Sequence, residues 1–305
     1  MLNYIGRRVL YAVFVMIGVV TVTFFIARLT GDPVRLMLPP DATIEQEEQL
    51  RAQLGMDEPL PLQFVQYMGQ VFTGDLGTSL RYRAPVLDLI VERLPATLQL
   101  AGIAMLFAIA FAMVAGVAAA RYRGTPAESG IMSFVLLGQS MPTFAVGMVA
   151  ILVFAVGLGW FPASGAGTWG HVVLPAATLG LALMANIARL LRSAMLEVLN
   201  EDYIRTARGK GVHDRRVVTW HALRNALLPV ITVIGMETGT LLGGAVVTET
   251  VFGYPGVGRL IIDSISARDF PMVQGVVIIL AGVFVLANLL VDITYSVLDP
   301  RIRLE

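Results

Sequence analysis

The 305-residue sequence balances 22 basic against 22 acidic side chains and contains no cysteine. The zero net charge argues against a nucleic-acid-binding protein, which needs a basic surplus, and the lack of cysteine excludes disulfides, thiolate catalysis and cysteine-ligated metals. Hydrophobic residues make up 56% of the chain and the mean hydropathy is +0.74, which is typical of an all-α protein that crosses a membrane several times.

Six apolar segments are long enough to span a membrane, whose core of about 30 Å needs roughly 20 residues of helix. Arg7 and Arg8 precede the first, which we interpret as a retained helix because it is long for a signal peptide and no clean cleavage site follows. Pro142 interrupts the third segment, whereas Pro229 and Pro271 lie at or just before the starts of the fifth and sixth. The expected spans are about 9–29, 96–120, 130–158, 172–191, 228–251 and 273–297.

The charges indicate an orientation. If the N-terminus is cytoplasmic, most arginines fall on the cytoplasmic side, and the acidic loop after the first span falls outside. We therefore expect both termini in the cytoplasm. The predicted parts are a first span with its N-terminal segment (1–29), an external loop domain (30–95) and a core membrane domain (96–305) that contains a cytoplasmic loop (192–228). The cytoplasmic arginines include Arg121, Arg123, Arg189 and Arg192, the cluster from Arg205 to Arg224, and Arg301 with Arg303.

The external loop has helical character between residues 44 and 72. Pro59 and Pro61 divide this stretch, so we predict two amphipathic helices, followed by a glycine-rich turn over residues 74–78. The apolar positions behind this prediction are Leu50, Leu54, Phe64, Val65, Met68 and Phe72.

A strongly basic segment covers residues 202–229, between two apolar segments. Tyr203, Ile204, Ala207 and Gly211 share helical spacing, while the basic residues among them point elsewhere. The pattern predicts a short surface helix that presents a small-residue face to a partner.

Polar residues interrupt the later spans. Glu237 lies about 12 Å into the fifth span at 1.5 Å per residue, and a carboxylate at that depth should face a polar pathway or a partner. Asn186, Gln139 and Ser140 are further polar positions, and we expect these four to line a path. Structural hydrogen bonding between helices remains the alternative. Asp292 lies near the cytoplasmic end of the last span, where we expect an interfacial residue.

Motifs for chemistry are missing from the sequence. The histidines, His171, His213 and His221, form no H-E-x-x-H motif, and no serine lies in a G-x-S-x-G elbow. No metal-ligand cluster is evident. Around Gly209 and Lys210 the sequence also fails to match a phosphate-binding loop. We expect no enzyme activity, and any ATP hydrolysis must come from other polypeptides.

The basic segment carries a family resemblance. RTARGKG at residues 205–211, followed by HALRNALLP at 221–229, resembles the cytoplasmic EAA loop of ABC-transporter permeases in the variant of dipeptide and oligopeptide importers. Arg205 and Thr206 stand where the general motif has Glu and Ala, and His221, Leu223 and Arg224 replace its closing residues, as in that branch. Further blocks resemble the family in order, at residues 7–26, 31–33, 74–86, 92–100, 140–147, 159–165, 174–180, 249–260 and 295–303.

The resemblance implies a type I ABC importer permease with six transmembrane helices, of the B type with a long first external loop. Its implied partners are a second permease subunit, two cytoplasmic ATPases that bind ATP and Mg²⁺, an extracytoplasmic binding protein and membrane lipid. This chain itself would hold no cofactor or metal. The implied location is the bacterial inner membrane, and the implied cargo is di- or oligopeptides. A nickel chelate, glutathione or a sugar is the alternative cargo, and an ion-coupled secondary transporter is the less favoured alternative function.

The resemblance also implies which residues meet the partners. ATPase coupling falls on Arg205, Thr206, Ala207, Arg208, Lys210, Gly211 and Val212. Binding-protein docking falls on Gly74, Asp75, Leu76, Gly77, Tyr254, Pro255 and Gly256. A G-x-x-x-G pattern at Gly235 and Gly239, continued by Gly243 and Gly244, predicts close packing of the fifth span, either on the second permease or within the chain.

Overall fold

The structure is a computed structural model that describes residues 2–30, 43–53 and 57–298. These residues are helical apart from turns, loops and one isolated bridge between Thr78 and Pro85. The block at 31–33, Leu54 and the residues from 299 onwards lie outside the described part. The chain forms two compact units, which are described separately: unit 1 combines Met1–Pro95 with Gly256–Glu305, and unit 2 is Ala96–Pro255.

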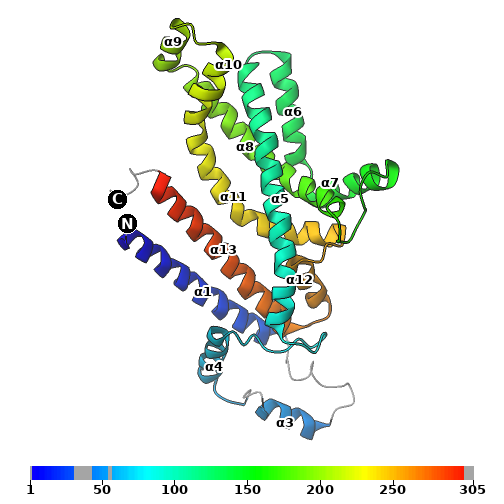
Figure 1. Cartoon of the computed structure of the whole chain (residues 1–305). Coiled ribbons are helices and arrows are strands. Elements are labelled where there is room, and N and C mark those ends of the chain that lie inside the picture. The colour runs from blue at the N-terminus through cyan, green and yellow to red at the C-terminus, as the bar shows by residue number, and fades with distance from the viewer. Residues whose placement is uncertain (1, 31–42, 54–56, 299–305) are drawn as a thin grey trace. The chain divides into compact units, whose positions relative to one another are not determined.

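Unit 1 is built on two long apolar helices, α1 (Leu2–Thr30) and α13 (Phe270–Leu298). They pack side by side and run antiparallel, so the start of α1 and the end of α13 lie at the same end (Figure 1). The unit also holds α3 (Ile44–Gln53), α4 (Leu60–Thr73), the start of α5 (Val86–Arg121) and α12 (Val257–Ser266). Its core consists of Val86, Ile90, Val257, Leu260, Met272 and Val276.

An aromatic cluster attaches α4 to the end of α1. The Phe24 ring lies 5.3 Å from Phe64 and 5.5 Å from Tyr67, centroid to centroid. Arg28 lies over the Phe24 ring at 3.6 Å, and its Nη2 donates to Gln63 Oε1 at 2.7 Å. Buried aromatic pairs and a desolvated cation over a ring each contribute to such docking.

The two predicted external helices are present, as α3 and α4. Pro59 caps α4 and Pro61 lies in its first turn, where a missing N–H costs little. The expectation that both are amphipathic is wrong for α3, whose few apolar residues do not gather on one side. Its sequence is dominated by Glu, Gln and Arg, so it has no apolar face to bury.

Unit 2 packs around α8 (Gly170–Val198). This helix contacts α6 (Pro126–Ser140), α7 (Thr143–Ala150) and α11 (Leu223–Phe252). Small residues allow close approach: a Cβ built on Gly180 would lie 2.7 Å from the carbonyl oxygen of Ala104 on α5. The remaining elements are the π-helical η1 (Ile151–Gly157), α9 (Asp202–Gly209), α10 (Asp214–Arg216) and the π-helical η2 (Val217–Ala222).

The glycines of α11 pack within the chain. Gly235 and Gly239 are buried, and a Cβ on Gly244 would lie 2.8 Å from Leu179 of α8. Of the two predicted uses of this face, the structure favours packing inside the chain. Gly243 is exposed with open space beside it.

Within the described residues, five helices are long and apolar enough to cross a membrane, and a sixth crossing there would have to come from α6 with α7 and η1. These two halves are bent by 106° at the break that contains Pro142. The expectation of one span over 130–158 therefore needs correction, because proline ends the first helix and redirects the chain.

Two helices begin earlier than their predicted spans. Helix α5 starts at Val86, with Pro95 inside it, and its 36 residues extend about 54 Å at 1.5 Å per residue. Because that exceeds the apolar core of about 30 Å, part of α5 must lie beyond the membrane core. Pro229 lies inside α11 rather than at its start. A membrane helix tolerates an internal proline because its neighbours satisfy the freed backbone group.

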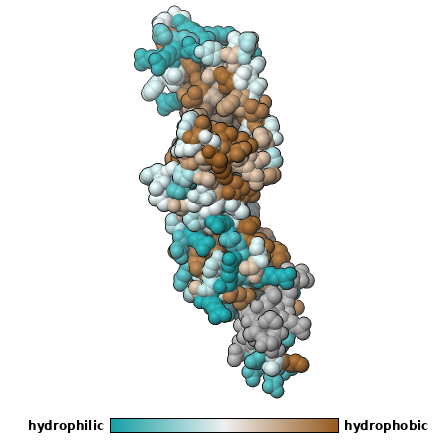
Figure 2. Space-filling view, turned by 90° about the vertical axis from the view of Figure 1, so that its right-hand side faces the viewer, coloured by the Kyte–Doolittle hydropathy of each residue, from teal (hydrophilic) through white to brown (hydrophobic). Residues whose placement is uncertain are grey.

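The surface of unit 2 separates by polarity. The connection from α5 to α6, with Arg121 and Arg123, lies at the same end as α9 and α10 (Figure 1). Figure 2 shows that this end is hydrophilic and that a hydrophobic band follows it along the unit. Exposed apolar side chains such as Val114, Phe134 and Leu137 are typical of a surface that faces lipid.

Candidate functional site

A chain of hydrogen bonds joins three helices of unit 2. Gln139 Nε2, at the end of α6, donates to Asn186 Oδ1 on α8 at 3.0 Å. Asn186 Nδ2 in turn donates to Glu237 Oε1 on α11 at 2.9 Å. Three of the four residues predicted to line a path therefore meet, and we call Gln139, Asn186 and Glu237 the polar chain.

Two residues that the sequence reasoning missed extend the polar chain. Arg189 Nη2 donates to Asn186 Oδ1 at 2.8 Å, and Thr240 Oγ1 donates to Glu237 Oε2 at 2.8 Å. Each lies three residues after its partner on the same helix, which is the spacing that brings side chains together. This spacing could have indicated both, but Arg189 was considered only as one of the cytoplasmic arginines.

The fourth predicted path residue, Ser140, does not join the polar chain. Its Oγ donates to the carbonyl of Leu136 on its own helix at 2.9 Å. The side chain is exposed at the last position of α6, beside the sharp break. Ser140 thus marks the end of a helix whose final carbonyls lack helical partners.

The polar chain lies at the surface of unit 2 rather than in its core. Gln139, Arg189 and Thr240 are exposed, and Asn186 and Glu237 are half-buried. Neither Glu237 nor Arg189 has an oppositely charged group within 4.0 Å among the described residues. The chain therefore links helices, and it also leaves two unlike charges open on one face.

The predicted coupling segment begins in α9, where two of the four residues of its small-residue face are turned inward. Ile204 is fully buried and Ala207 is partly buried against the main core of unit 2. Tyr203 and Gly211 of the same face are exposed, so only part of the predicted face is open to a partner, and Ile204 is the apolar anchor that attaches α9 to the core. The exposed side carries Arg205, Thr206, Arg208 and Lys210 instead.

Gly211 ends the segment rather than belonging to the helix. Its φ is +78°, a left-handed conformation that glycine adopts without steric cost. Its N–H donates to the Arg208 carbonyl at 2.9 Å, and the N–H of half-buried Val212 donates to the Ala207 carbonyl at 3.2 Å. These bonds satisfy the last carbonyls of α9, as at many helix C-termini.

The basic side of the segment is open to solvent. Arg205 pairs with Asp202 at 3.3 Å and Arg208 with Asp214 at 3.2 Å, both exposed. Exposed pairs of this kind contribute little to stability, so they can be exchanged for a partner's carboxylates. Lys210 and Arg224 are exposed and have no ion pair among the described residues.

A shallow hollow continues this basic surface. Its volume is about 400 Å³, and Trp220 on its rim is 64% exposed. The other lining residues are His213, Arg215, Arg216 and Thr219.

The predicted docking loop after α4 is fixed within unit 1. Gly74 and Gly77 have φ of +83° and +80°, and Asp75 Oδ1 accepts from the Gly77 N–H at 2.9 Å. Leu76 packs partly buried against the core of unit 1. Fully buried Asp269, which the sequence reasoning missed, accepts from Ser79 Oγ at 2.5 Å and so ties the following residues to the start of α13.

The second predicted docking stretch divides between the units. Tyr254 is 4% exposed, packs in the core of unit 2, and its hydroxyl lies 3.4 Å from Gln99 Oε1. Its side chain is therefore placed to support the turn rather than to contact a partner. Pro255 is exposed, and Gly256 caps α12 in unit 1.

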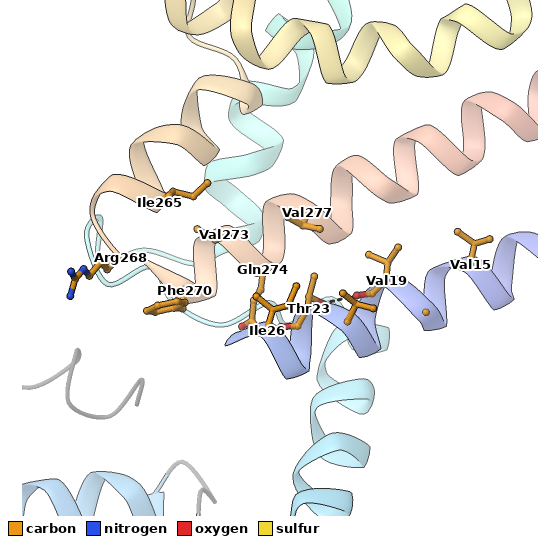
Figure 3. Close-up of a pocket in the computed structure, with 12 residues that line it drawn as sticks. Val15, Val19, Thr23, Ile26, Ile265, Arg268, Phe270, Val273, Gln274 and Val277 are labelled. Carbon is orange, nitrogen blue, oxygen red and sulfur yellow. Dashed lines mark hydrogen bonds between the residues drawn. The ribbon is translucent and has the colours of Figure 1, made fainter. Parts of the chain in front are cut away.

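Unit 1 contains a groove of about 790 Å³ between α1 and the α12–α13 region (Figure 3). Valine and isoleucine line most of it, with Arg268 and Phe270 at one end. Gln274 Nε2 donates to the Thr23 carbonyl across it at 3.1 Å. The apolar lining matches the lipid-facing character of both helices. In the described part of the chain, no group of three or more His, Cys, Asp or Glu could hold a metal.

These features define a class: a polytopic, all-helical membrane protein with a polar chain across its helices and a basic helix at one end. The chain belongs to the family of binding-protein-dependent transport system inner membrane components. That family's model matches residues 97–304, and the model of its N-terminal part matches residues 1–101.

Proteins that match nearly the whole chain support the same family. The glutathione transport system permease protein GsiC of Escherichia coli (strain K12) is 44% identical over 304 residues, which cover 99% of each chain. The protein of the same name from Salmonella typhi is 43% identical over the same length and coverage.

Two solved structures share the fold. The inward-facing MetNI methionine ABC transporter matches with a TM-score of 0.57 and 19% identity over 69% of this chain and 96% of that chain. An amino acid ABC transporter solved with histidines matches with a TM-score of 0.52 and 16% identity, over 70% of this chain and 94% of that chain. The predicted all-helical fold of a type I ABC importer permease is thus confirmed.

The protein is a multi-pass inner-membrane permease of an ABC importer, in the peptide and nickel branch of the family. It is a non-catalytic subunit that works with ATPase and substrate-binding partners. Family membership decides against the ion-coupled secondary transporter and against a membrane-embedded enzyme.

Proposed function

We propose that this permease imports short peptides, with glutathione among them. The observation that carries the proposal is the polar chain of Gln139, Asn186 and Glu237 across three helices. Its amides offer both donors and acceptors, which is what a peptide backbone requires. The 44% identity to a glutathione permease along 99% of the chain supports the same class of cargo.

The position of the polar chain supports a place on the path. Gln139 is the penultimate residue of α6, directly before the 106° break. Transporters often place cargo at broken membrane helices, because the ends of the half-helices leave backbone groups free. Gln139, Ser140, Asn186 and Glu237 would then face the cargo as it passes between two permease subunits. The exposed side of α11 at Gly243 is where the second subunit would approach.

The exposed side of α9 would dock into the ATPase subunits, which bind ATP and Mg²⁺. Arg205, Thr206, Arg208 and Lys210 would form the contact, with Ala207, Gly211 and Val212 shaping the helix and its end. Because Ile204 is anchored in the core of unit 2, movement of the ATPases would pass to the membrane helices. In this proposal α9 and both termini would lie in the cytoplasm.

On the outer side, the binding protein would meet the turn that holds Gly74, Asp75 and Gly77, with Leu76 anchoring it. Pro255 and Gly256 would form a second contact with the binding protein, and Tyr254 would support Pro255 from the core of unit 2. The turn is held by its own hydrogen bonds and by Asp269, so it offers a preformed shape. Preformed surfaces bind with a smaller entropic cost.

Reconstitution tests the cargo. The complete importer would be placed in proteoliposomes and supplied with its binding protein, ATP and labelled dipeptide, tripeptide, glutathione, a nickel chelate or a disaccharide. We expect ATP-dependent uptake of the short peptides and glutathione. Uptake of only the nickel chelate or the sugar would overturn the proposed cargo.

A charge reversal tests the coupling surface. Lys210→Glu should lower both transport and cargo-stimulated ATP hydrolysis about tenfold, because it places a carboxylate where the ATPase rim supplies carboxylates. Arg121→Glu is the matched control, since Arg121 is an exposed basic residue at the same end of unit 2 but outside α9. Equal losses in the two variants would contradict a specific role for α9.

A further inference from the structure

The polar chain brings two opposite charges to one amide. Asn186 accepts from the Arg189 guanidinium through Oδ1 and donates to the Glu237 carboxylate through Nδ2. Among the described residues, neither charged group has an ion-pair partner within 4.0 Å. The neutral Asn186 side chain therefore bonds to both a cation and an anion, and these two groups form no ion pair with each other.

Uncompensated charges on membrane helices are costly and are typically retained for function. Among the described residues, Glu237 receives side-chain hydrogen bonds only from the neutral donors of Asn186 and Thr240. Arg189 uses one of its five N–H donors, on Asn186. Both groups keep capacity for a charged ligand. A structural cross-link between α8 and α11 would need only the amide and the carboxylate, so it does not account for Arg189.

We infer that Arg189, Asn186 and Glu237 form a bipolar binding site for zwitterionic cargo. Glu237 receives the α-ammonium group of the cargo and Arg189 receives its carboxylate. Asn186 is a positioning residue that sets the spacing between the two charged groups. The inference rests on the proposed function, and it narrows the substrate class to short molecules that carry both a free amino and a free carboxylate group.

The spacing suits a short peptide. Hydrogen bonds of 2.8 and 2.9 Å on either side of one amide keep the guanidinium and carboxylate no more than about 8 Å apart. An extended peptide advances about 3.3–3.6 Å per residue, so the termini of a dipeptide fall within this range. Guanidinium and carboxylate groups also give the strongest hydrogen bonds available to such termini, because both partners are charged.

A cycle that crosses protein variants with blocked peptides tests the site. The complete importer in nanodiscs would be titrated with a dipeptide, its N-acetyl form and its C-amide form, and the thermal shift would report binding to the folded protein. In the wild type we expect each blocked terminus to weaken apparent affinity about tenfold or more, as loss of a charge-assisted hydrogen bond should.

Two variants should show which charged side chain binds which terminus of the peptide. In Glu237→Gln, N-acetylation of the peptide should no longer weaken the apparent affinity, whereas C-terminal amidation should still weaken it. In Arg189→Gln we expect the opposite: amidation should have no effect and N-acetylation should still weaken binding. Thr250→Val is the control, because Thr250 is an exposed polar residue of α11 whose hydroxyl bonds only the Val246 carbonyl of its own helix. It should leave the effects of both blocking groups unchanged.

Three outcomes would overturn the inference. Both variants could still bind the blocked peptides more weakly to the same extent as the wild type does, or each variant could lose affinity equally for all three peptides. The third is a wild-type importer that transports the peptides but shows no thermal shift with any of them. The uptake assay separates this failure from failure of the proposed function. A wild-type importer that takes up none of the peptides contradicts the proposed function, whereas uptake without the expected pattern contradicts only the bipolar site.

Discussion

Helices α1 and α8 have the same length but opposite surroundings. Each contains 29 residues, yet the most apolar stretch of α1 is 17% buried and that of α8 is 67% buried. The mean hydropathy runs the other way, at 2.6 for α1 and 1.6 for α8. The less hydrophobic helix is the one enclosed by protein.

The difference follows from the solvent that each helix meets. Lipid cannot satisfy polar groups, so a helix that faces lipid must be apolar on most of its surface. A helix enclosed by other helices can carry small and polar residues, because its neighbours pack against them and bond to them. Helix α8 uses this freedom for Gly180, which approaches α5, and for Asn186, which bonds to α6 and α11. For this pair of helices, the higher hydropathy goes with exposure to lipid, and the lower value belongs to the helix that carries Asn186, the middle residue of the polar chain.

The largest expected contrast is in cavity formation. Leu191 of α8 is fully buried, so Leu191→Ala should lower the stability of the importer by about 2–5 kcal/mol. Val22 of α1 is 56% exposed, and Val22→Ala should cost less than about 1 kcal/mol. Unfolding of the purified importer in increasing SDS measures both, and similar losses would show that α1 is as enclosed as α8.

Replacing a glycine by alanine should change stability in opposite directions on the two helices. In Gly180→Ala the new Cβ would meet the Ala104 carbonyl at 2.7 Å, so we expect destabilisation by about 1–3 kcal/mol. In Gly18→Ala on α1 the new Cβ meets nothing within 4 Å, and the gain in helix propensity should stabilise by about 0.5–1 kcal/mol. Thermal denaturation midpoints of the two variants should move in opposite directions, and a shared direction would contradict the packing described for α8.

The smallest contrast concerns transport rather than folding. Asn186→Leu removes the amide that joins Arg189 to Glu237, and peptide uptake should fall about tenfold, or about 1.4 kcal/mol. Thr21→Val on α1 removes a hydroxyl that, among the described residues, bonds only the Ile17 carbonyl of its own helix, and uptake should not change. Uptake per importer in proteoliposomes is the measurement. Full activity in Asn186→Leu would remove the polar chain from the path.

Much of the fold follows from the sequence because apolar segments of spanning length are a strong signal. The early start of α5 and the place of Pro229 inside α11 were not predictable, since a proline reads as a boundary until its neighbours are known. Pro142 gave the break in the third segment, but the 106° angle depends on packing.

The site was predictable in part. The sequence indicated Glu237, Asn186 and Gln139 separately, because each is a polar residue inside an expected span. Only the structure shows that they bond to each other. Helical spacing grouped Ile204 with Ala207 correctly but could not tell whether that face meets a partner or the core. Asp269 gave no signal, because the Ser79 that it binds lies 190 residues away.

The antiparallel arrangement of α1 and α13 has a topological consequence. If the first and last crossings run in opposite directions, the total number of crossings is even. The five unbroken helices of the described residues give five crossings, which is an odd number. An even number therefore requires that the bent pair of α6 and α7 also crosses the membrane. The 106° bend therefore lies within the segment on which an even number of crossings depends.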